Sequence, residues 1–348
     1  LTGSGGIFKM DIDVRSMESD KLYITDDFSG TQAIDIYQKD AYVPAGSSME
    51  GTGLVLASVN GNGVFTAHDR EGTLFYTHYD LAHQASATAG YATDWYLDKI
   101  ITLDKPTTSV ETVTAAGALN YHTWRNENDK LLKRMGELRH NGADEKGAWF
   151  RVKGSKIGRD GKFAFENKYT TYELGYDELT KKTATKTRYQ GAAISYTDGS
   201  SSYQSGSGDN SSKAISFYNT ELGNKGHYLD VVLKFSHMDN DFKVYDTANN
   251  KITGSIENTG VALSAEYGRK KNLDKGWYIE PQAQFTLGYL GGDNYRTSNG
   301  IEVSQSGIKS AVGRIGFNLG KEVGSKGIVY AKANLLHEFG GGYETTLT

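Results

Sequence analysis

The chain has 348 residues, enough for one large domain or two ordinary ones, and it contains no cysteine, which excludes disulfides and thiolate metal sites. Its eight histidines lack the spacing of metal ligands, so we expect no metal or other cofactor, and the absence of a run of eighteen apolar residues predicts no transmembrane helix. Up to Lys105 there are 15 acidic and 7 basic residues, whereas the rest has 27 acidic and 31 basic, which predicts two domains in different surroundings.

Residues 1–104 read as short strands separated by glycine, asparagine, aspartate and serine. Apolar side chains alternate within these segments, as in Ile7, Met10, Ile12 and Val14. Strands at this spacing favour a sandwich or a β-solenoid, and the lack of an exact repeat is typical of the capping end of a solenoid. The chain begins in mid-strand, so we expect it to be part of a longer protein. The expected strands are 6–14, 20–26, 32–39, 53–59, 63–68, 73–81 and 94–103.

A polar helix is expected from Thr114 to Arg139, after a break at Pro106. About 25 residues at about 1.5 Å rise give nearly 40 Å, enough to cross a bilayer. Its surface is charged, and each charge facing lipid would cost several kcal/mol. The sequence therefore predicts that this helix lies inside a barrel lumen. Taken alone, its pattern also fits, less well, an ordinary solvated linker helix.

Nine amphipathic strands are expected after Gly147. In 277–290, Trp277, Phe285 and Leu287 share one face and Glu280 the other, a period of two that indicates a half-apolar strand. Segments of about ten such residues are typical of a transmembrane β-barrel, although a soluble sandwich alternates in the same way. The connections between strands favour the barrel, because every second connection, with the first as an exception, is longer and more polar than the others. The longer set comprises 158–162, 198–211, 238–257 and 290–300, and the shorter set comprises 177–186, 223–226, 269–276 and 320–327. The strands are 147–157, 163–176, 187–197, 212–222, 227–237, 258–268, 277–289, 301–319 and 328–339.

The order of solenoid cap, polar helix and barrel resembles the monomeric autotransporters of Gram-negative bacteria, the type V secretion proteins. Single motifs are weak, but six in the right order favour the family, and the likeness covers essentially the whole chain. They are Asp94-Trp95-Tyr96-Leu97, Trp124-Arg125 with Leu132 to Arg139, Gly147 to Arg151, Glu280 to Gln284, Val312 to Gly316, and Tyr330 to Ala333 with His337 to Gly341.

The resemblance implies an all-β fold: a right-handed β-helix cap, then an antiparallel outer-membrane barrel with a helix in its lumen. Residues 1–104 are the pertactin-like passenger end and folding-initiating region, 105–146 the linker and pore helix, and 147–348 the β-domain. The family's barrel has twelve strands, so we expect this one to be C-terminally truncated, with nine of twelve strands, and unable to close by itself.

The function implied by the resemblance is that of a translocator that exports its own N-terminal passenger, a virulence-associated role, and not that of an enzyme. The passenger emerges C-terminus first, and residues 1–104 fold at the cell surface, where their apolar burial, about 25 cal/mol per Å², biases the chain outward. Expected partners are outer-membrane lipid, the β-barrel assembly machinery, periplasmic chaperones and the upstream passenger, but no nucleic acid. The location is the outer membrane of a Gram-negative bacterium.

The candidate site residues lie in the helix and on the inner barrel wall. We expect Glu280, Arg314 and Lys332 to approach the helix. The helix residues are Trp124, Arg125, Lys133, Arg134, Met135, Gly136, Glu137, Leu138 and Arg139. The lumen-facing wall residues are Glu280, Gln282, Gln284, Arg314, Lys332 and Asn334.

Passenger cleavage has one candidate position. Some family members cut themselves in this helix, where an asparagine side-chain amide attacks its own carbonyl at an Asn-Asn pair. Asp129-Lys130 takes that place here. Because an ionised aspartate is a poor attacking group, this departure argues against self-cleavage and favours the simpler interpretation that both residues are charges on a lumen helix.

The sequence supports two rival functions less well than export. A surface hydrolase would need a nucleophile with its base, or paired carboxylates, but the sequence has no Gly-x-Ser-x-Gly, His-Glu-x-x-His or glycine-rich phosphate loop. A surface adhesin or binding module would use its passenger or its long loops. In that case, deletion of 198–211 should abolish binding without affecting export.

Overall fold

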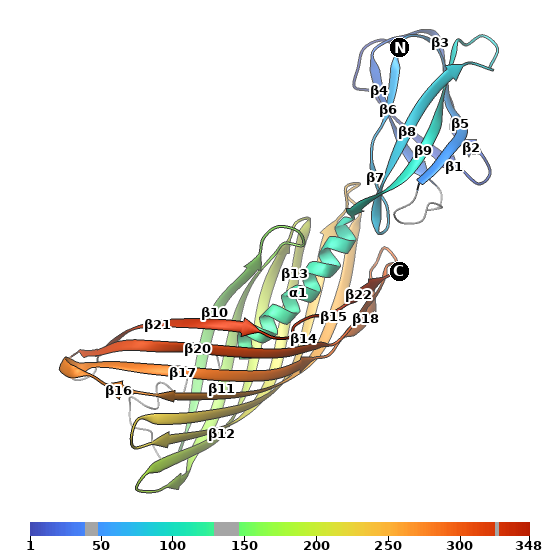
Figure 1. Cartoon of the computed structure of the whole chain (residues 1–348). Helices are drawn as coiled ribbons and strands as arrows, with labels where there is room; N and C mark the ends of the chain where they lie inside the picture. Colours follow the sequence, from blue (N-terminus) through green and yellow to red (C-terminus); the bar gives the residue numbers. More distant parts are fainter. Residues whose placement is uncertain (39–47, 129–145, 324–326) are drawn as a thin grey trace. The chain divides into compact units, whose positions relative to one another are not determined.

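Figure 1 shows the computed structural model, which describes residues 1–38, 48–128, 146–323 and 327–348. The chain divides into two compact units, residues 1–110 with 246–250 and residues 111–245 with 251–348. Strands dominate both units, and the described part of the chain has one α-helix, α1 (Thr108–Asn128). Among the described residues, no helix is both long and apolar enough to cross a membrane.

The first unit contains two sheets whose strands are partly stacked in parallel. In one sheet β1 (Ile7–Asp13), β4 (Thr31–Gln38) and β6 (Val64–Ala67) are parallel, which is the rung pattern expected of a solenoid. The short β2 (Glu18–Ser19) pairs antiparallel with β1. The other sheet has the order β3 (Leu22–Phe28), β5 (Ser48–Gly61), β9 (Thr93–Pro106), β8 (Phe75–Ala85) and β7 (Arg70–Glu71), with only β3 and β5 parallel.

The alternating apolar side chains of these strands form a closed core. Phe28, Ile34, Leu56 and Leu97 are fully buried there, and Phe65 stacks on Phe28 with ring centroids 4.6 Å apart. Burial of each such side chain stabilises the fold by about 1.5–3 kcal/mol. After the parallel rungs, β8 and β9 pair antiparallel at the C-terminal end of the unit.

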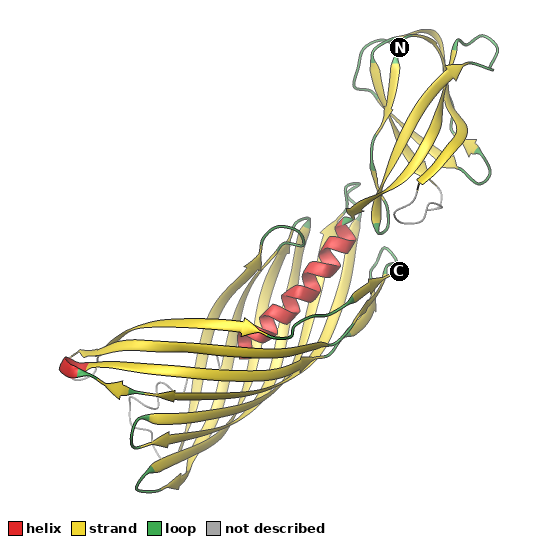
Figure 2. Ribbon diagram, viewed as in Figure 1, coloured by secondary structure: helices red, strands yellow, loops and turns green. Residues whose placement is uncertain are grey.

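The second unit is built on an antiparallel sheet whose neighbouring strands mostly follow chain order. Its strand order is β10-β11-β12-β13-β14-β15-β17-β20-β21, with β16 (Lys271–Asn272) beside β17, and the sheet curls around α1 (Figure 2). The strands are β10 (Lys146–Arg159), β11 (Phe165–Lys182), β12 (Lys186–Tyr203), β13 (Gly206–Gly223), β14 (His227–Tyr245), β15 (Lys251–Arg269), β17 (Trp277–Leu290), β20 (Ile308–Val323) and β21 (Gly327–Glu338). A 3-10 turn, η2 (Asp274–Gly276), precedes β17, and a small sheet joins β18 (Asp293–Arg296), β19 (Glu302–Gln305) and β22 (Thr345–Leu347).

The expected fold class and the nine consecutive strands of the main sheet are confirmed, with β10 and β21 at the ends of the strand order. The expected strand 301–319 is too long, because this segment divides into β19 and β20, which belong to different sheets. The helix begins at Thr108 instead of Thr114. Its expected continuation to Arg139 lies outside the described residues.

The prediction of long polar loops at 198–211 and 238–257 is wrong. β12 and β13 continue through the first of these to a turn at residues 204–205, and β14 and β15 continue through the second to a turn at 246–250. Small polar side chains keep the strand alternation there: Thr197, Ser201 and Asn210 are buried, with exposed residues between them. Strands of 18 or 19 residues exceed the about 9–11 that span a bilayer, so these hairpins extend beyond it.

The two faces of the main sheet have inverted polarity relative to a soluble protein. Its outer face exposes large apolar side chains, among them Phe150, Leu174, Phe217 and Ile315, whereas Asn167, Glu173, Lys234, Asn240 and Glu266 are buried on the inner face. An apolar surface of this extent exceeds what soluble monomers expose and fits a lipid environment. The inner face remains polar and is occupied by α1.

Candidate functional site

The helix α1 runs along the inside of the curled sheet (Figure 2). Its side chains form hydrogen bonds with the inner face of the sheet along the helix. Near its middle, the Asn120 amide donates to Asn258 Oδ1 at 2.8 Å on β15 and accepts from Asn240 Nδ2 at 2.9 Å on β14. Both wall asparagines are fully buried. Because buried amides without partners are costly, these paired amides favour one rotation and one depth of the helix.

Glu127, the residue before the last of α1, is the centre of a buried charged contact. Its carboxylate accepts from Thr197 Oγ1 at 2.6 Å and from Lys234 Nζ at 3.4 Å, and Ser212 Oγ lies 3.5 Å away. Glu127 is 2% exposed and Lys234 is 3% exposed. Removing one partner of such a buried pair lowers the free energy of unfolding by about 3–5 kcal/mol, because the other charge stays buried without a partner. The contact joins the helix to β12, β13 and β14 together.

Trp124 fits against two positions of the wall that have no side chain. A Cβ placed on Gly260 of β15 would lie 2.5 Å from its Nε1, and one placed on Gly288 of β17 would lie 2.5 Å from its ring. Both distances are shorter than any van der Waals contact, so glycine is required for the indole to lie there. Trp124 is 2% exposed and packs with Tyr121, Ala262 and Leu290.

Glu338, the last residue of β21, ties the helix to the end of the main sheet. Its carboxylate accepts from Tyr121 Oη at 2.7 Å, from Ser310 Oγ at 2.9 Å and from the backbone N–H groups of Ala311 and Gly340 at 2.8 and 3.1 Å. Arg125 Nε lies 3.6 Å from the same carboxylate. At the opposite end of the strand order, Thr123 accepts from Asn167 Nδ2 of β11 at 3.0 Å. The helix is thus bonded to strands near both ends of the sheet.

A second polar network lies on β14, β15, β17, β20 and β21. Arg314 pairs with the buried Glu266 and donates to Gln284 at 2.7 Å and to Asn334 at 2.8 Å. Tyr228 donates to Glu266 at 2.5 Å, and Glu280 accepts from Gln282 at 2.7 Å. Lys332 is exposed and lies opposite Asn318.

The network thus brings together five of the six wall residues selected from the sequence. The expected approach of Glu280, Arg314 and Lys332 to the helix remains a prediction. The hydrogen-bonding partners of Glu280 and Arg314 described above lie on the wall, and the rest of the selected helix lies outside the described residues. That part comprises Lys133, Arg134, Met135, Gly136, Glu137, Leu138 and Arg139, together with Asp129 and Lys130.

Sequence reasoning missed the residues that hold the described helix: Asn120, Tyr121, Thr123, Glu127, Asn240, Asn258 and Glu338. A signal for two of them was available, since Asn240 continues the inward parity of β14 beyond the expected strand 227–237, and Asn258 is the first residue of the expected strand 258–268. Which wall position meets which helix residue depends on strand tilt and helix rotation, and neither follows from the local pattern.

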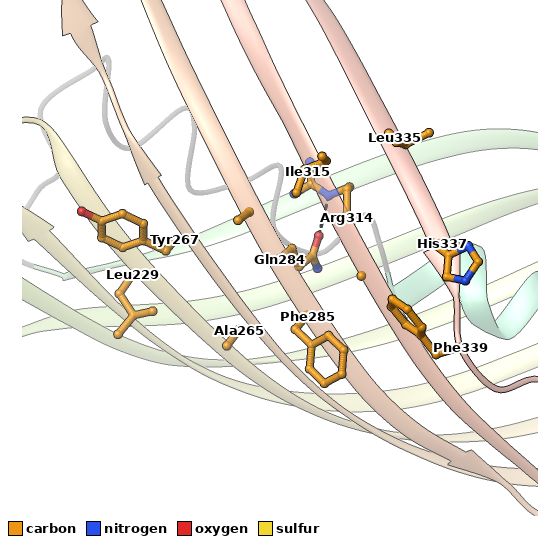
Figure 3. A pocket seen from close by; sticks show the side chains of 12 residues that line it. Leu229, Ala265, Tyr267, Gln284, Phe285, Arg314, Ile315, Leu335, His337 and Phe339 are labelled. Atoms are coloured by element: carbon orange, nitrogen blue, oxygen red, sulfur yellow. Dashed lines mark hydrogen bonds between the residues drawn. The ribbon is translucent and has the colours of Figure 1, made fainter.

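The outer wall carries a shallow apolar hollow on β14, β15, β17, β20 and β21 (Figure 3). The hollow forms where the small residues Ala265, Ala283 and Gly313 leave the wall surface lower than its surroundings. Larger apolar side chains of Leu229, Tyr267, Phe285, Ile315, Leu335 and Phe339 surround it. Most of these residues are exposed, which matches a lipid-facing surface and not a binding site for a polar ligand.

Residues 148–348, more than half of the chain, match the family model of the autotransporter β-domain. The pertactin autotransporter of Bordetella parapertussis is 35% identical over 225 residues, which cover 63% of this chain and 24% of that protein. The probable autotransporter YcgV of Escherichia coli is 31% identical over 230 residues, covering 64% and 24%. The chain therefore spans about a quarter of the length of these curated relatives.

Two solved translocators have a similar fold. The β-domain of the Bordetella autotransporter BrkA aligns with a TM-score of 0.51 and 26% identity, over 58% of this chain and 86% of that one. The translocator domain of NalP from Neisseria meningitidis also aligns with a TM-score of 0.51, at 17% identity, over 67% and 84%. The family model over residues 148–348, together with the apolar outer face and the polar, helix-filled inner face of the sheet, places the chain in the autotransporter β-domain family.

Proposed function

We propose that residues 147–348 form the barrel through which this protein exports its own upstream passenger, that 105–146 are the linker and pore helix, and that 1–104 are the passenger's C-terminal end. The observation that supports this division is the set of bonds from α1 to the inner wall. A helix that carries Asn120, Glu127 and Arg125 would be unstable in lipid, and here each of these side chains has a polar partner on the wall.

We also propose that residues 1–104 fold after they emerge and so bias transport outward. Their parallel rungs suit this role because each strand stacks on the preceding one, and folding can propagate from one end. Phe28, Ile34 and Leu97 become fully buried only when the unit folds. Before that, the same surfaces are exposed, so the unfolded passenger requires periplasmic chaperones.

The β-barrel assembly machinery is the proposed partner for insertion. Strands entering a bilayer carry backbone N–H and C=O groups, and each unpaired group costs several kcal/mol in hydrocarbon. An assembly factor that pairs with β10 or β21, the terminal strands of the described sheet order, would lower this cost.

We propose no catalytic role for the β-domain, residues 147–348. Two relatives bear the names of serine proteases, SepA of Shigella flexneri at 28% identity and EspC of Escherichia coli at 26%, and this chain matches only 16% and 19% of their lengths. The passenger of the present protein is proposed to stay attached or to be cut by another protease. Mass spectrometry of outer-membrane protein tests this, and a new N-terminus at Lys130 would overturn it.

The position of the helix can be tested by crosslinking, because the chain has no native cysteine. Asn120→Cys together with Asn258→Cys should be joined by a short, reducible thiol-reactive crosslinker in isolated outer membranes, because the two side-chain amides are hydrogen-bonded, 2.8 Å apart. Asn120→Cys with Thr259→Cys is the matched control, because residue 259 projects to the other face of β15. Crosslinking of the control pair, or of neither pair, would contradict a helix inside the barrel.

The same cysteine pair tests export. Formed before translocation ends, the crosslink should trap the passenger, so protease added to intact cells should no longer release it. Cells in which the crosslinker has been reduced should display the passenger normally. Equal display in crosslinked and reduced cells, with the crosslink formed early, would argue that export does not pass along this helix.

A further inference from the structure

Three side chains of metal-ligating types meet on the outer face of the β14–β15 hairpin. His237 and Asp239 lie on β14, and Glu257 lies on β15. One ligand atom from each lies within 4.8 Å of the others. His237 and Glu257 are exposed and Asp239 is half-buried, so the cluster is open to ions. By strand alternation all three side chains project to the outer face, away from the inner wall.

The strand register explains why they meet. Asp239 pairs with Glu257, and His237 pairs with Thr259. Met238, Asn240 and Asn258, which alternate with them, are buried on the inner face. On the outer face, the preceding pair is Phe235 and Val261, where the apolar band begins. The cluster therefore lies just beyond the lipid-facing surface.

The two carboxylates face each other without a basic partner. Like charges directly opposite on antiparallel strands destabilise the pair. Among the described residues, neither Asp239 nor Glu257 forms an ion pair with a lysine or arginine, and Asp239 Oδ1 lies 3.3 Å from His237 Nε2. A bound cation would relieve this repulsion.

The imidazole is oriented by a residue outside the cluster. His237 Nδ1 lies 3.4 Å from Thr259 Oγ1, which turns Nε2 toward the carboxylates. A partner on the second ring nitrogen is the arrangement that orients metal-binding histidines. The backbone N–H of Glu257 donates to Asp293 Oδ2 at 2.8 Å, which fixes the strand at this ligand.

We propose that His237, Asp239 and Glu257 bind one divalent transition-metal ion, Zn²⁺ or a similar ion, with one coordination position left for water. One imidazole nitrogen with two carboxylate oxygens is a donor set of zinc sites, whereas Mg²⁺ and Ca²⁺ prefer oxygen ligands alone. The ion joins β14 to β15 where the hairpin leaves the apolar band. Histidine spacing did not reveal the site because two of its ligands are carboxylates and one comes from a neighbouring strand.

The test is a Zn²⁺ titration of the whole detergent-purified protein after EDTA treatment, followed by calorimetry. We expect one ion per chain, with affinity at least tenfold lower in His237→Ala, Asp239→Asn or Glu257→Gln. His227→Ala removes another exposed histidine of the same strand and should leave the affinity unchanged. X-ray absorption should show a single imidazole at about 2.0–2.1 Å from zinc.

A second measurement separates loss of the site from misfolding. In the metal-free protein, Glu257→Gln removes a like-charge repulsion, so its thermal midpoint should equal or exceed that of the unmodified chain. The midpoint of the unmodified chain alone should rise with Zn²⁺. The proposal is overturned if Zn²⁺ fails to bind in a one-to-one ratio, if the triple variant binds it equally well, or if Mg²⁺ or Ca²⁺ displaces it at equal concentration.

Discussion

Glu127 of α1 and Lys234 of β14 form an ion pair, with Oε2 and Nζ 3.4 Å apart, in which both side chains are almost completely buried. Taking two charges out of water is expensive, and the attraction between them repays this only when their remaining hydrogen-bonding groups are satisfied. The hydroxyl groups of Thr197 and Ser212 donate hydrogen bonds to the Glu127 carboxylate and so satisfy part of this requirement. The pair therefore acts as a specific link between helix and wall, and its value lies more in fixing the position of the helix than in net stability.

Removal of one charge of this pair should destabilise the docked helix strongly. We expect Glu127→Gln or Lys234→Met alone to lower the free energy of unfolding by about 3–5 kcal/mol, because the other charge stays buried without a partner. The double variant should be less destabilised than either single one. Thermal unfolding and single-channel conductance in planar bilayers measure the two consequences, a lower midpoint and a pore that opens more often.

The exposed pair of Lys156 and Glu166, 2.7 Å apart, provides the control for charge alone. Glu166→Gln should change stability by no more than about 1 kcal/mol and leave conductance unchanged, since exposed ion pairs contribute little. If Glu127→Gln behaved like Glu166→Gln, the link between helix and wall would be wrong.

The glycine positions beneath Trp124 should be intolerant of any side chain. Gly260→Ala and Gly288→Ala each place a Cβ 2.5 Å from the indole, so the helix or the strand must shift, and overpacking of this kind costs about 1–3 kcal/mol. Trp124 fluorescence should move to longer wavelength as the ring loses its enclosed place. Gly154→Ala on β10 is the matched control, because a Cβ there meets nothing within 4 Å.

The same clash predicts a compensating substitution. Trp124→Ala should itself destabilise by about 3–5 kcal/mol, but adding Gly288→Ala to it should cost little more, because the ring that the new methyl group met is gone. Additive losses in the double variant would show that Gly288 is needed for a reason unrelated to Trp124.

The hydroxyl group of Tyr121 should help to hold β21 to the helix. Tyr121→Phe removes one donor to the Glu338 carboxylate and keeps the ring, so we expect a loss of about 1–3 kcal/mol, since the bond is to a charged group. Hydrogen exchange should accelerate selectively in β20 and β21. Tyr196→Phe, which removes an outward-facing exposed phenol of β12, should not alter exchange in these strands.

The main sheet was predictable from the sequence because its signal is local. Alternation such as Leu229, Val231, Leu233 and Phe235 defines both the strand and its lipid face, whatever lies across the barrel. Strand ends were less predictable, because Ser201 and Asn210 use small polar side chains to meet a polar interior, and these residue types are equally common in turns. The site itself depends on pairs far apart in sequence, such as Asn120 with Asn258, whose meeting requires the curl of the whole sheet.

The unit formed by residues 1–110 should lose stability in acid through Asp94. This residue is 2% exposed, and although burial opposes its ionisation, hydrogen bonds from Ser58 and Ser86, both 2.6 Å, and from the Ala87 N–H, 3.0 Å, hold the pKa of its carboxyl below the usual value. A carboxyl whose pKa is lower in the folded state contributes stability above its unfolded pKa of about 3.9. That contribution is lost as the pH falls through the folded pKa.

Asp94→Asn should therefore lower the thermal midpoint of this unit at pH 7, because the amide puts an N–H donor where two hydroxyls or a backbone N–H already donate. We expect a loss of about 2–3 kcal/mol, comparable to one or two hydrogen bonds to a charged group. The difference between variant and unmodified protein should shrink as the pH falls below about 3.9, where the unmodified carboxyl loses its advantage. Near-ultraviolet circular dichroism of the neighbouring Trp95, buried in the core of the same unit, follows the transition in the full chain. A stability difference that stays constant from pH 7 to pH 2 would show that Asp94 acts through its shape and not through its charge.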